Sequence, residues 1–476
     1  MDRRSPLAAL IATGAWFSSE PAYTASSLDG RSMGWLWALP FVGMLLSIAI
    51  GPLLSPKVWH AHYGKIALGW GVLTLAPLAI FYSTSAALTV FVHTTLAEYM
   101  SFIFLLFALY TVAGGILLTG SIRASPWKNA GILALGTSAA SLVGTTGAAM
   151  IFIRPLISAN KGRKNNAHVV VFFIILVANI GGALTPIGDP PLLVGFLHGI
   201  RFFWPAQHLW LQTIILAGLV LTLFFAFDFW QFRNEVTPRT TAPVEPLKLH
   251  GLINFLLLGI IIAAILMAAI WDAGIAFDVY GTKVELQNLL RDGVLVLVAL
   301  ASLWLTPSEH RAASGFSWEP IREVAILFAG IFVAIIPVVA MLKAGPDGKF
   351  AFLLEAVTTR DGSPHEAAYF WLTGGLSAFL DNAPTYLVFF ELAGGDATQL
   401  MGPLAGTLAA ISMGAVYMGA LTYIGNAPNF MVLAIAQERG IRMPNFFGYT
   451  LWAGVILIPL FVLLTLLPIA PLLKLG

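Results

Sequence analysis

Residues 179–191 read NIGGALTPIGDPP, within a chain of 476 residues that is 58% hydrophobic. This stretch holds three glycines, three prolines and one aspartate, Asp189. Glycine ends a helix readily, and proline prevents a helix from continuing through it. We therefore expect two half-helices with a non-helical break between them, and a carboxyl group at the break.

A second stretch repeats this frame. Residues 418–428 read MGALTYIGNAP, and both stretches contain GALTxIGxxP. Gly182, Thr185, Gly188 and Pro191 match Gly419, Thr422, Gly425 and Pro428, and Asp189 falls opposite Asn426. The sequence therefore predicts two related broken helices.

Composition indicates that lipid surrounds the protein. Only 10% of the residues are charged and the mean hydropathy is +0.85, whereas a soluble domain carries about 25% charged residues. Apolar runs of roughly 20 residues, each long enough to cross the hydrocarbon core, recur along the chain. The sequence predicts an all-α polytopic membrane protein in the cell inner membrane. A net charge of +2 gives no reason to expect a nucleic-acid partner, and with no cysteine the chain has no thiolate metal site.

The N-terminal segment, 1–32, is open to more than one interpretation. Its basic start and short apolar run fit a secretory signal. A first helix or a membrane-surface segment fits the same residues.

Two apolar segments, 130–158 and 366–394, each run to 29 residues and are polar and glycine-rich at the centre. Two membrane crossings need about 40 residues and one tilted crossing about 20 to 25. We therefore expect re-entrant hairpins, each with two short arms and a polar tip covered by protein or water. Lys and Arg flank the first hairpin on both sides, which predicts that both of its ends are cytoplasmic. The second hairpin is then predicted to enter from the opposite face.

Each half of the chain thus contains a hairpin followed by a broken helix, in opposite orientations. Two inverted repeats with paired broken helices are typical of secondary transporters. The predicted units are the N-terminal segment 1–32, scaffold helices 33–120, a transport unit 121–200, scaffold helices and connecting loops 201–342, a second transport unit 343–440, and a C-terminal transmembrane helix 441–476.

The hairpin tips and the breaks hold the candidate site residues. Asp189 is predicted at a helix N-cap, and Asn426 is expected to cap the matching half-helix. Because Ser or Asn caps equally well, an ionisable residue at this depth favours a function over capping alone. For Asp381, whose capping pattern is weaker, the alternative is a protonated carboxyl that holds the hairpin. The predicted cation- or substrate-binding residues are Ser141, Thr145, Thr146, Thr185, Asp189, Ser377, Asp381, Asn382, Thr422 and Asn426, with Na⁺ at Asp189 and Asp381.

Other charged residues are expected to have simpler roles. Arg154 is predicted to be an anchor or salt-bridge partner, with a counter-charge for an anionic substrate as the alternative. Asp228 and Glu391 fall at span ends and are expected to be solvated, and His168 and His198 are expected at the membrane interface.

ANIGGALTPIGDPP, SAFLDNAPTYLVF and YIGNAPN resemble motifs of the ion transporter superfamily. The resemblance is strongest to the NhaD-like sodium/proton antiporters and to relatives named as citrate transporters, and it covers residues 120–200 and 366–440. It implies a homodimer with a scaffold domain and a transport domain that slides as an elevator. The dicarboxylate symporters of this superfamily carry Ser-Asn-Thr at both tips. The first tip here has no Asn, which disfavours a dicarboxylate site.

The leading hypothesis is antiport of Na⁺ or Li⁺ against H⁺, without any cofactor beyond the transported or coupling Na⁺. Burial favours a neutral carboxyl group and a bound cation favours the carboxylate, so Na⁺ and H⁺ compete for Asp189 and Asp381. The alternative is Na⁺- or H⁺-coupled symport of a carboxylate such as citrate. A channel or a membrane-embedded enzyme is a third class, which no catalytic motif in the spans supports.

Overall fold

The computed structural model describes residues 28–120, 124–235, 246 and 248–466. The predicted N-terminal segment therefore lies outside the described residues except for 28–32. The described chain is almost entirely helical, apart from two small antiparallel ribbons. In these ribbons β1 (Leu117–Thr119) pairs with β2 (Lys248–His250), and β3 (Ala276–Val279) pairs with β4 (Thr282–Glu285).

The membrane-spanning character predicted from composition is confirmed. Among the described residues, seven helical segments are long and apolar enough to cross a membrane, and a bent pair of helices makes an eighth if it counts as one span. The seven segments are Trp35–Leu54, Pro56–Phe81, Thr84–Ala113, Trp204–Asn234, Ile253–Ile270, Leu286–Leu305 and Phe446–Leu466. The protein is thus an all-α, multi-pass membrane protein.

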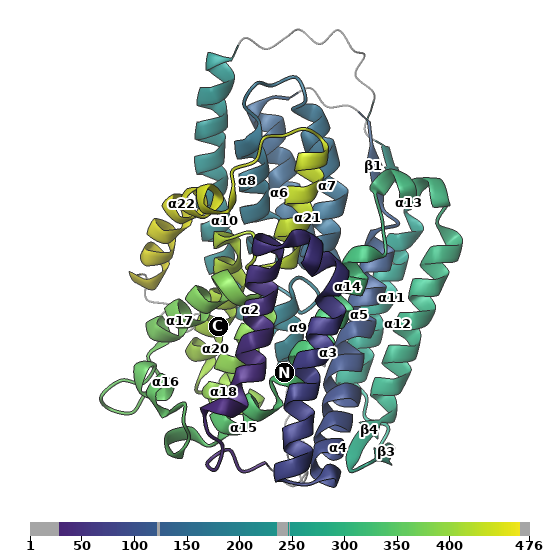
Figure 1. Cartoon of the computed structure of the whole chain (residues 1–476). Coiled ribbons are helices and arrows are strands. Elements are labelled where there is room, and N and C mark those ends of the chain that lie inside the picture. The colour runs from purple at the N-terminus through teal and green to yellow at the C-terminus, as the bar shows by residue number, and fades with distance from the viewer. Residues whose placement is uncertain (1–27, 121–123, 236–245, 247, 467–476) are drawn as a thin grey trace, which may run out of the picture.

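One group of long helices packs together, from the middle to the right of Figure 1. It comprises α2 (Leu39–Leu54), α3 (Pro56–Phe81), α4 (Thr84–His93), the π-helical η2 (Thr94–Tyr99), α5 (Met100–Ala113), α11 (Ile253–Ile270), α12 (Leu286–Leu305) and α14 (Glu319–Ala334). The short α13 (Ser308–Ser314) precedes α14, and α15 (Ile336–Lys343) follows it at a bend of 41°. η1 (Trp35–Ala38) leads into α2, and η4 (Gly345–Asp347) and α16 (Ala351–Ala356) follow α15.

Two pairs of short helices contain the segments predicted as hairpins. α6 (Pro126–Val143) and α7 (Thr145–Ala159) pack against each other on either side of Gly144, and α17 (Glu366–Leu380) and α18 (Asn382–Leu392) do so around Asp381. Gly144 has φ 80° and ψ 152°, and Asp381 has φ 75° and ψ 138°. The two turns thus share a backbone conformation that glycine adopts freely and other residues rarely do. Figure 1 shows the first pair in the upper half of the molecule and the second in the lower half.

Both predicted helix breaks are present. The first runs from α8 (Ala167–Leu176) through η3 (Ile180–Gly182) to α9 (Pro190–Leu197), and the second from α20 (Ala405–Met418) through η5 (Gly419–Leu421) to α21 (Ala427–Glu438). The glycines let the non-helical segments fold back tightly. A Cβ at Gly188 would collide with the backbone of Gly182, and a Cβ at Gly425 with that of Gly419. α19 (Ala397–Met401) precedes the second broken helix.

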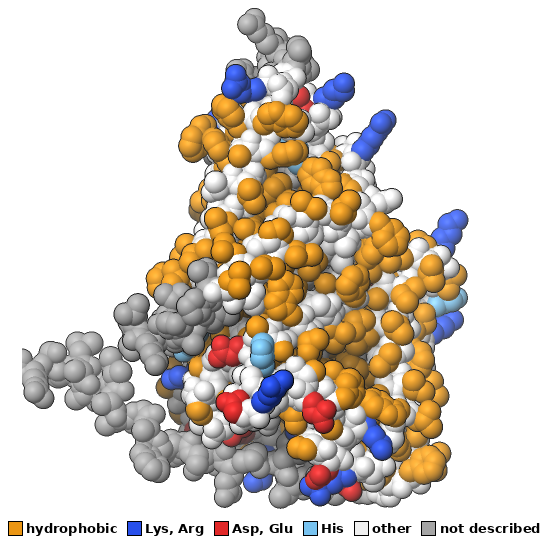
Figure 2. Space-filling model, turned by 90° about the vertical axis from the view of Figure 1, so that its left-hand side faces the viewer, with side chains coloured by type: hydrophobic (Ala, Val, Ile, Leu, Met, Phe, Trp, Pro, Cys, Tyr) orange, Lys and Arg blue, Asp and Glu red, His pale blue; other side chains and the backbone are white. Residues whose placement is uncertain are grey.

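α10 (Trp204–Asn234) and α22 (Phe446–Leu466) complete the fold. α10 packs against α6, α8, α20 and α22, so it lies with the short helix pairs and broken helices. Figure 2 shows one face on which hydrophobic side chains cover most of the middle, with Lys and Arg side chains at its upper edge. Such a surface suits a lipid environment.

Candidate functional site

Asp189 lies at the first break and is 1% exposed. It occupies the N-cap position of α9 as predicted, yet its carboxylate makes no hydrogen bond to the described first turn of that helix. The carboxylate instead accepts hydrogen bonds from Thr145 Oγ1 at 3.1 Å, Asn382 Nδ2 at 2.6 Å and Asn426 Nδ2 at 2.9 Å. Asp189 therefore connects both helix pairs and both broken helices, which a helix cap does not do.

The expectation that the Asn426 side chain caps α21 is wrong. Asn426 stands at the N-cap position, but its side chain makes no capping bond to the described first turn. Its amide donates to Asp189 Oδ1 and to the Ala178 carbonyl, at 2.9 and 3.0 Å. A hydrogen bond to a buried carboxylate is stronger than one to a neutral group, so the amide turns toward Asp189.

Asp381 behaves in the opposite way and does cap its helix. Its Oδ1 accepts a hydrogen bond of 3.2 Å from the Ala383 backbone N–H in the first turn of α18. The sequence indicated only a weak capping pattern here. Asp381 occupies the turn position that Gly144 has in the first helix pair. Asp can do so because it tolerates positive φ better than most residues.

A cavity of about 100 Å³ joins these residues. Its polar lining comes from the α6–α7 and α17–α18 turns and from both breaks, and includes Thr145, Thr146, Asp189, Asp381, Asn382 and Asn426. Its opposite wall is formed by Leu106, Leu109 and Tyr110 of α5 and by Pro320, Ile321, Val324 and Phe328 of α14. Two carboxyl groups thus share one small cavity between the short helices and the long ones.

The polar groups of the cavity lining suit a cation better than an anion. Among the described lining residues there is no Lys, Arg or His. Asn382 Oδ1 is buried and finds no hydrogen-bond partner in the described part of the chain, while its Nδ2 is bound to Asp189. An unpartnered buried oxygen beside two carboxyl groups is the type of ligand that hard cations prefer.

Four helices begin at this cavity. The first residues of α7, α9, α18 and α21 all line it, namely Thr145, Pro190, Asn382 and Ala427. A helix N-terminus carries a partial positive charge of about half an elementary charge. These N-termini direct a positive potential into the cavity, which is favourable for carboxylates and for other anions.

The remaining predicted hydroxyls lie beside the cavity and bond to backbone carbonyls. Ser141 donates to Gly181 O at 2.5 Å and Ser377 to Ala415 O at 2.7 Å. Thr185 donates to Ser141 O, and Thr422 donates to Ala378 O at 2.5 Å. In both halves, therefore, a threonine of the break is hydrogen-bonded to the C-terminal part of the first helix of the pair, α6 or α17.

Sequence reasoning missed Asn179 and Asn429, which are both fully buried. Asn179 Nδ2 donates to Asn429 Oδ1 at 2.8 Å, and Asn429 Nδ2 donates to the carbonyls of Gly419 and Thr422 at 2.9 Å each. These residues bind the two breaks to each other. A signal was present, because each Asn lies next to a break motif in an otherwise apolar segment.

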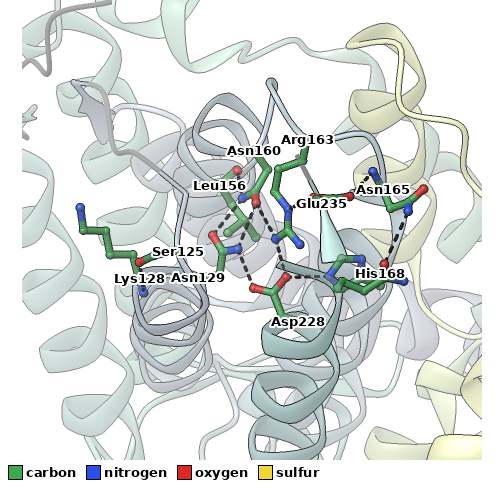
Figure 3. Close-up of polar contacts among 11 residues, drawn as sticks. Ser125, Lys128, Asn129, Leu156, Asn160, Arg163, Asn165, His168, Asp228 and Glu235 are labelled. Carbon is green, nitrogen blue, oxygen red and sulfur yellow. Dashed lines mark hydrogen bonds and ion pairs between the residues drawn. The ribbon is translucent and has the colours of Figure 1, made fainter. Parts of the chain in front are cut away.

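Asp228 was expected to be solvated, but it is fully buried in a polar cluster (Figure 3). Its carboxylate contacts Arg163, lies 2.8 Å from His168 Nε2, and accepts a hydrogen bond of 2.9 Å from Asn129. His168 is likewise 2% exposed rather than interfacial. The partners of this buried carboxylate come from α6, from α8 and from the segment after α7. Because loss of any partner would leave a buried charge poorly paired, the cluster holds α10 to these three segments.

The helices define a multi-pass membrane protein, and an internal cavity with two carboxyl groups lies between its two groups of helices. A family model described as "Putative citrate transport" matches residues 30–469. The chain therefore belongs to this transporter family.

Similar proteins are also named as transporters or membrane proteins. An uncharacterized transporter of Mycobacterium tuberculosis is 26% identical over 339 residues, which are 69% of this chain and 73% of the relative. A second uncharacterized transporter of that organism is 22% identical over 420 residues, 85% of this chain and 86% of the relative. A 46 kDa membrane protein of Mycobacterium leprae is 27% identical over 300 residues, 60% of this chain and 63% of the relative.

Proposed function

We propose that this transporter exchanges Na⁺ or Li⁺ for H⁺. The observation that carries the proposal is the small cavity that Asp189 and Asp381 share, with no basic side chain among its described lining residues. Amide, hydroxyl and carboxylate oxygens suit an alkali cation. An anion of several charges would instead face two carboxylates without a cationic side chain.

The proposed exchange follows from competition at this site. A cation bound by Asp189, Asp381 and Asn382 Oδ1 stabilises the ionised carboxylates. When the cation leaves, burial favours protonation, because ionised groups are poorly solvated at this depth. If the empty, doubly charged carrier does not move, each cycle transports cations one way and protons the other.

We further propose that the two helix pairs are re-entrant hairpins of an inverted repeat. The supporting observations are the shared turn conformation at Gly144 and Asp381, and the offset of 237 residues that relates Asp189 to Asn426. The same offset relates the Thr185–Ser141 hydrogen bond to the Thr422–Ala378 one. Broken helices in such repeats place ion sites near the middle of the membrane.

Alternating access is proposed to occur by an elevator motion, in a homodimer of the cell inner membrane. The mobile unit would contain residues 130–200 and 366–437. We now add α10 and α22 to it, because α10 packs on α6, α8, α20 and α22 and carries Asp228 of the buried cluster. The group α2 to α5, α11, α12 and α14 would form the scaffold, together with α13 and α15, which flank α14.

Carboxylate symport is the second candidate. The family description names citrate, and four helix N-termini at the cavity provide positive potential for an anion. The size of the cavity disfavours it. A volume of about 100 Å³ is smaller than the roughly 150 Å³ apolar cavity that accommodates benzene, and citrate has about twice as many non-hydrogen atoms as benzene.

Flux in proteoliposomes separates the two candidates. Purified protein is reconstituted with a pH-sensitive dye inside, and Na⁺, Li⁺, K⁺ or citrate is added outside. Antiport predicts that Na⁺ or Li⁺ alone alkalinises the lumen as protons leave. A pH change or uptake that requires citrate would instead establish symport and overturn the antiport assignment.

A further inference from the structure

Two charged residues outside the cavity occupy equivalent places in the proposed repeats. Arg154 of α7 and Glu391 of α18 each follow their turn residue, Gly144 or Asp381, by ten positions. Their separation equals the 237 residues between Asp189 and Asn426. Their side chains contact α13 and α15, the helices on either side of α14, which lie in the upper and the lower part of Figure 1.

Arg154 is bound to the end of α13. Its Nη1 donates to the carbonyl of Ser314, and the next residue, Gly315, has φ 69°. A Cβ at position 315 would overlap the Arg154 guanidinium, so a larger residue there would displace the end of this side chain, and glycine also adopts the positive φ without strain. The carbonyl end of a helix is a favourable place for a cation.

The receiving carbonyl is held firmly on the scaffold side. Ser314 Oγ donates to Gly114 O at 2.8 Å, and Arg311 Nη1 donates to Thr111 O at 2.8 Å. Both bonds attach α13 to the end of α5. The Arg154 contact therefore joins α7 to a rigid part of the long-helix group.

Glu391 was expected to be solvated, but it is 6% exposed. Its Oε2 lies 3.6 Å from Lys343 Nζ, at the end of α15. The other titratable groups at this joint are His93 of α4 and Glu98 of η2, 3.7 Å apart, and His198 at the end of α9. A buried carboxylate of α18 thus has its cation on α15, which continues the scaffold helix α14.

We propose that Arg154 and Glu391 are positioning residues that hold the mobile unit against the scaffold in the conformation of this structure, one at each end. The inference rests on the alternating-access part of the proposed function and not on the identity of the transported ion. When the mobile unit slides, each charge loses its partner, and an unpaired charge at low dielectric is unfavourable. The two contacts therefore set the population of this conformation.

A single cysteine on the cavity wall reports this population, since the chain has no native cysteine. Val324→Cys on α14 lines the cavity from the scaffold side, and its labelling rate by a water-soluble maleimide depends on how the mobile unit covers it. Arg154→Met and Glu391→Gln are each expected to change this rate in the same direction, by about threefold or more, because each removes a hydrogen bond or ion pair to a charged group.

Further variants separate positioning from misfolding. Arg154→Lys keeps the charge and should retain most of the original labelling rate. Gly315→Ala should reproduce the Arg154→Met shift from the scaffold side. Lys343→Met combined with Glu391→Gln removes both charges of the pair, so neither is left unpaired and the protein should fold. This double variant should show the same change in labelling rate as Glu391→Gln. Arg439→Gln, which removes an exposed charge near Arg154, is the matched control and should leave the rate unchanged.

The outcomes for positioning and for antiport differ. Unchanged labelling in Arg154→Met and Glu391→Gln, in protein with normal cation-driven proton flux, would overturn the positioning role alone. A shift of equal size in Arg439→Gln would also overturn it. Shifted labelling in the variants of a parent protein that itself shows no cation-driven proton flux would support the positioning role and exclude antiport.

Discussion

Asp189 and Asp381 lie in the same cavity, but Asp189 accepts hydrogen bonds from side chains and Asp381 from a backbone N–H, and this predicts different effects of the same substitution. The Asp381 carboxylate accepts one backbone N–H as a cap. Asn is an equally good cap and tolerates positive φ. Asp381→Asn should therefore lose less stability than the roughly 1 kcal/mol that removal of a helix cap costs. Cation-driven proton flux should be abolished, because the amide cannot titrate.

Both quantities are measurable on one preparation, by thermal unfolding in detergent and by flux in proteoliposomes. Asp396→Asn is the matched control, since Asp396 is an exposed cap of α19 that accepts from Thr398 N and Gln399 N. It should alter neither measurement. Normal exchange by Asp381→Asn would remove Asp381 from the mechanism.

Asp189→Asn should lose both flux and stability. Three donors point at the Asp189 carboxylate, from Thr145, Asn382 and Asn426. An amide offers one oxygen, so its own NH₂ would face at least one of these donors and leave it unsatisfied. The expected loss is about 1–3 kcal/mol of unfolding free energy, seen as a lower melting temperature than that of Asp381→Asn. A variant with full flux and parental stability would remove Asp189 from the mechanism.

At the scale of helices, the glycine and proline pattern predicted the breaks because these residues act locally on the backbone. Gly182, Gly188 and Pro190 end and restart the helix wherever the rest of the chain lies. The burial of Asp228 could not be predicted in this way. Its partners Asn129 and Arg163 lie 99 and 65 residues away in the chain, so only the packed structure brings them together.

The polar residues of the site were partly predictable, because local motifs contain them. Motif position identified Asp189, Asn382 and Asn426, which come together around one carboxylate. It did not indicate which residue caps a helix and which one accepts side-chain donors. That choice depends on the close approach of the two breaks, in which Asn179 and Asn429 join segments 250 residues apart.

The orientation of the two helix pairs is testable without knowledge of the substrate. If the pairs are re-entrant hairpins, both ends of each pair face the same side. Ser125→Cys and Gly162→Cys should both react with an impermeant thiol reagent from the cytoplasm, and Gly362→Cys and Asp396→Cys both from outside. Right-side-out and inverted vesicles provide the comparison. Reaction of positions 125 and 162 from opposite faces would turn the first pair into a span and exclude the inverted repeat.

For the whole molecule, the cavity lies between two groups of helices that are held together by different kinds of contact. The short helices and α10 are joined by buried polar clusters, around Asp189 and around Asp228. Against the long helices, the described cavity wall is largely apolar, apart from Tyr110. Apolar walls can slide past one another without leaving polar groups unpaired. If the proposed mobile unit slides, this division predicts that α10 moves with it.

Cross-linking tests this boundary directly. Met150→Cys on α7 with Ile321→Cys on α14 joins the proposed mobile unit to the scaffold, since both residues belong to one packed cluster with Tyr110. Trp127→Cys on α6 with Phe225→Cys on α10 replaces a ring pair 4.4 Å apart within the mobile unit. When a reducible bifunctional thiol reagent cross-links the first pair, flux should fall by about tenfold or more, because the link blocks the sliding of the mobile unit that each transport cycle needs. Reduction of the link should restore the flux. The second pair should transport normally when cross-linked. Loss of flux with the α6–α10 link would indicate that α10 belongs to the scaffold. Undiminished flux with the α7–α14 link would exclude the elevator motion and favour gating around a fixed site.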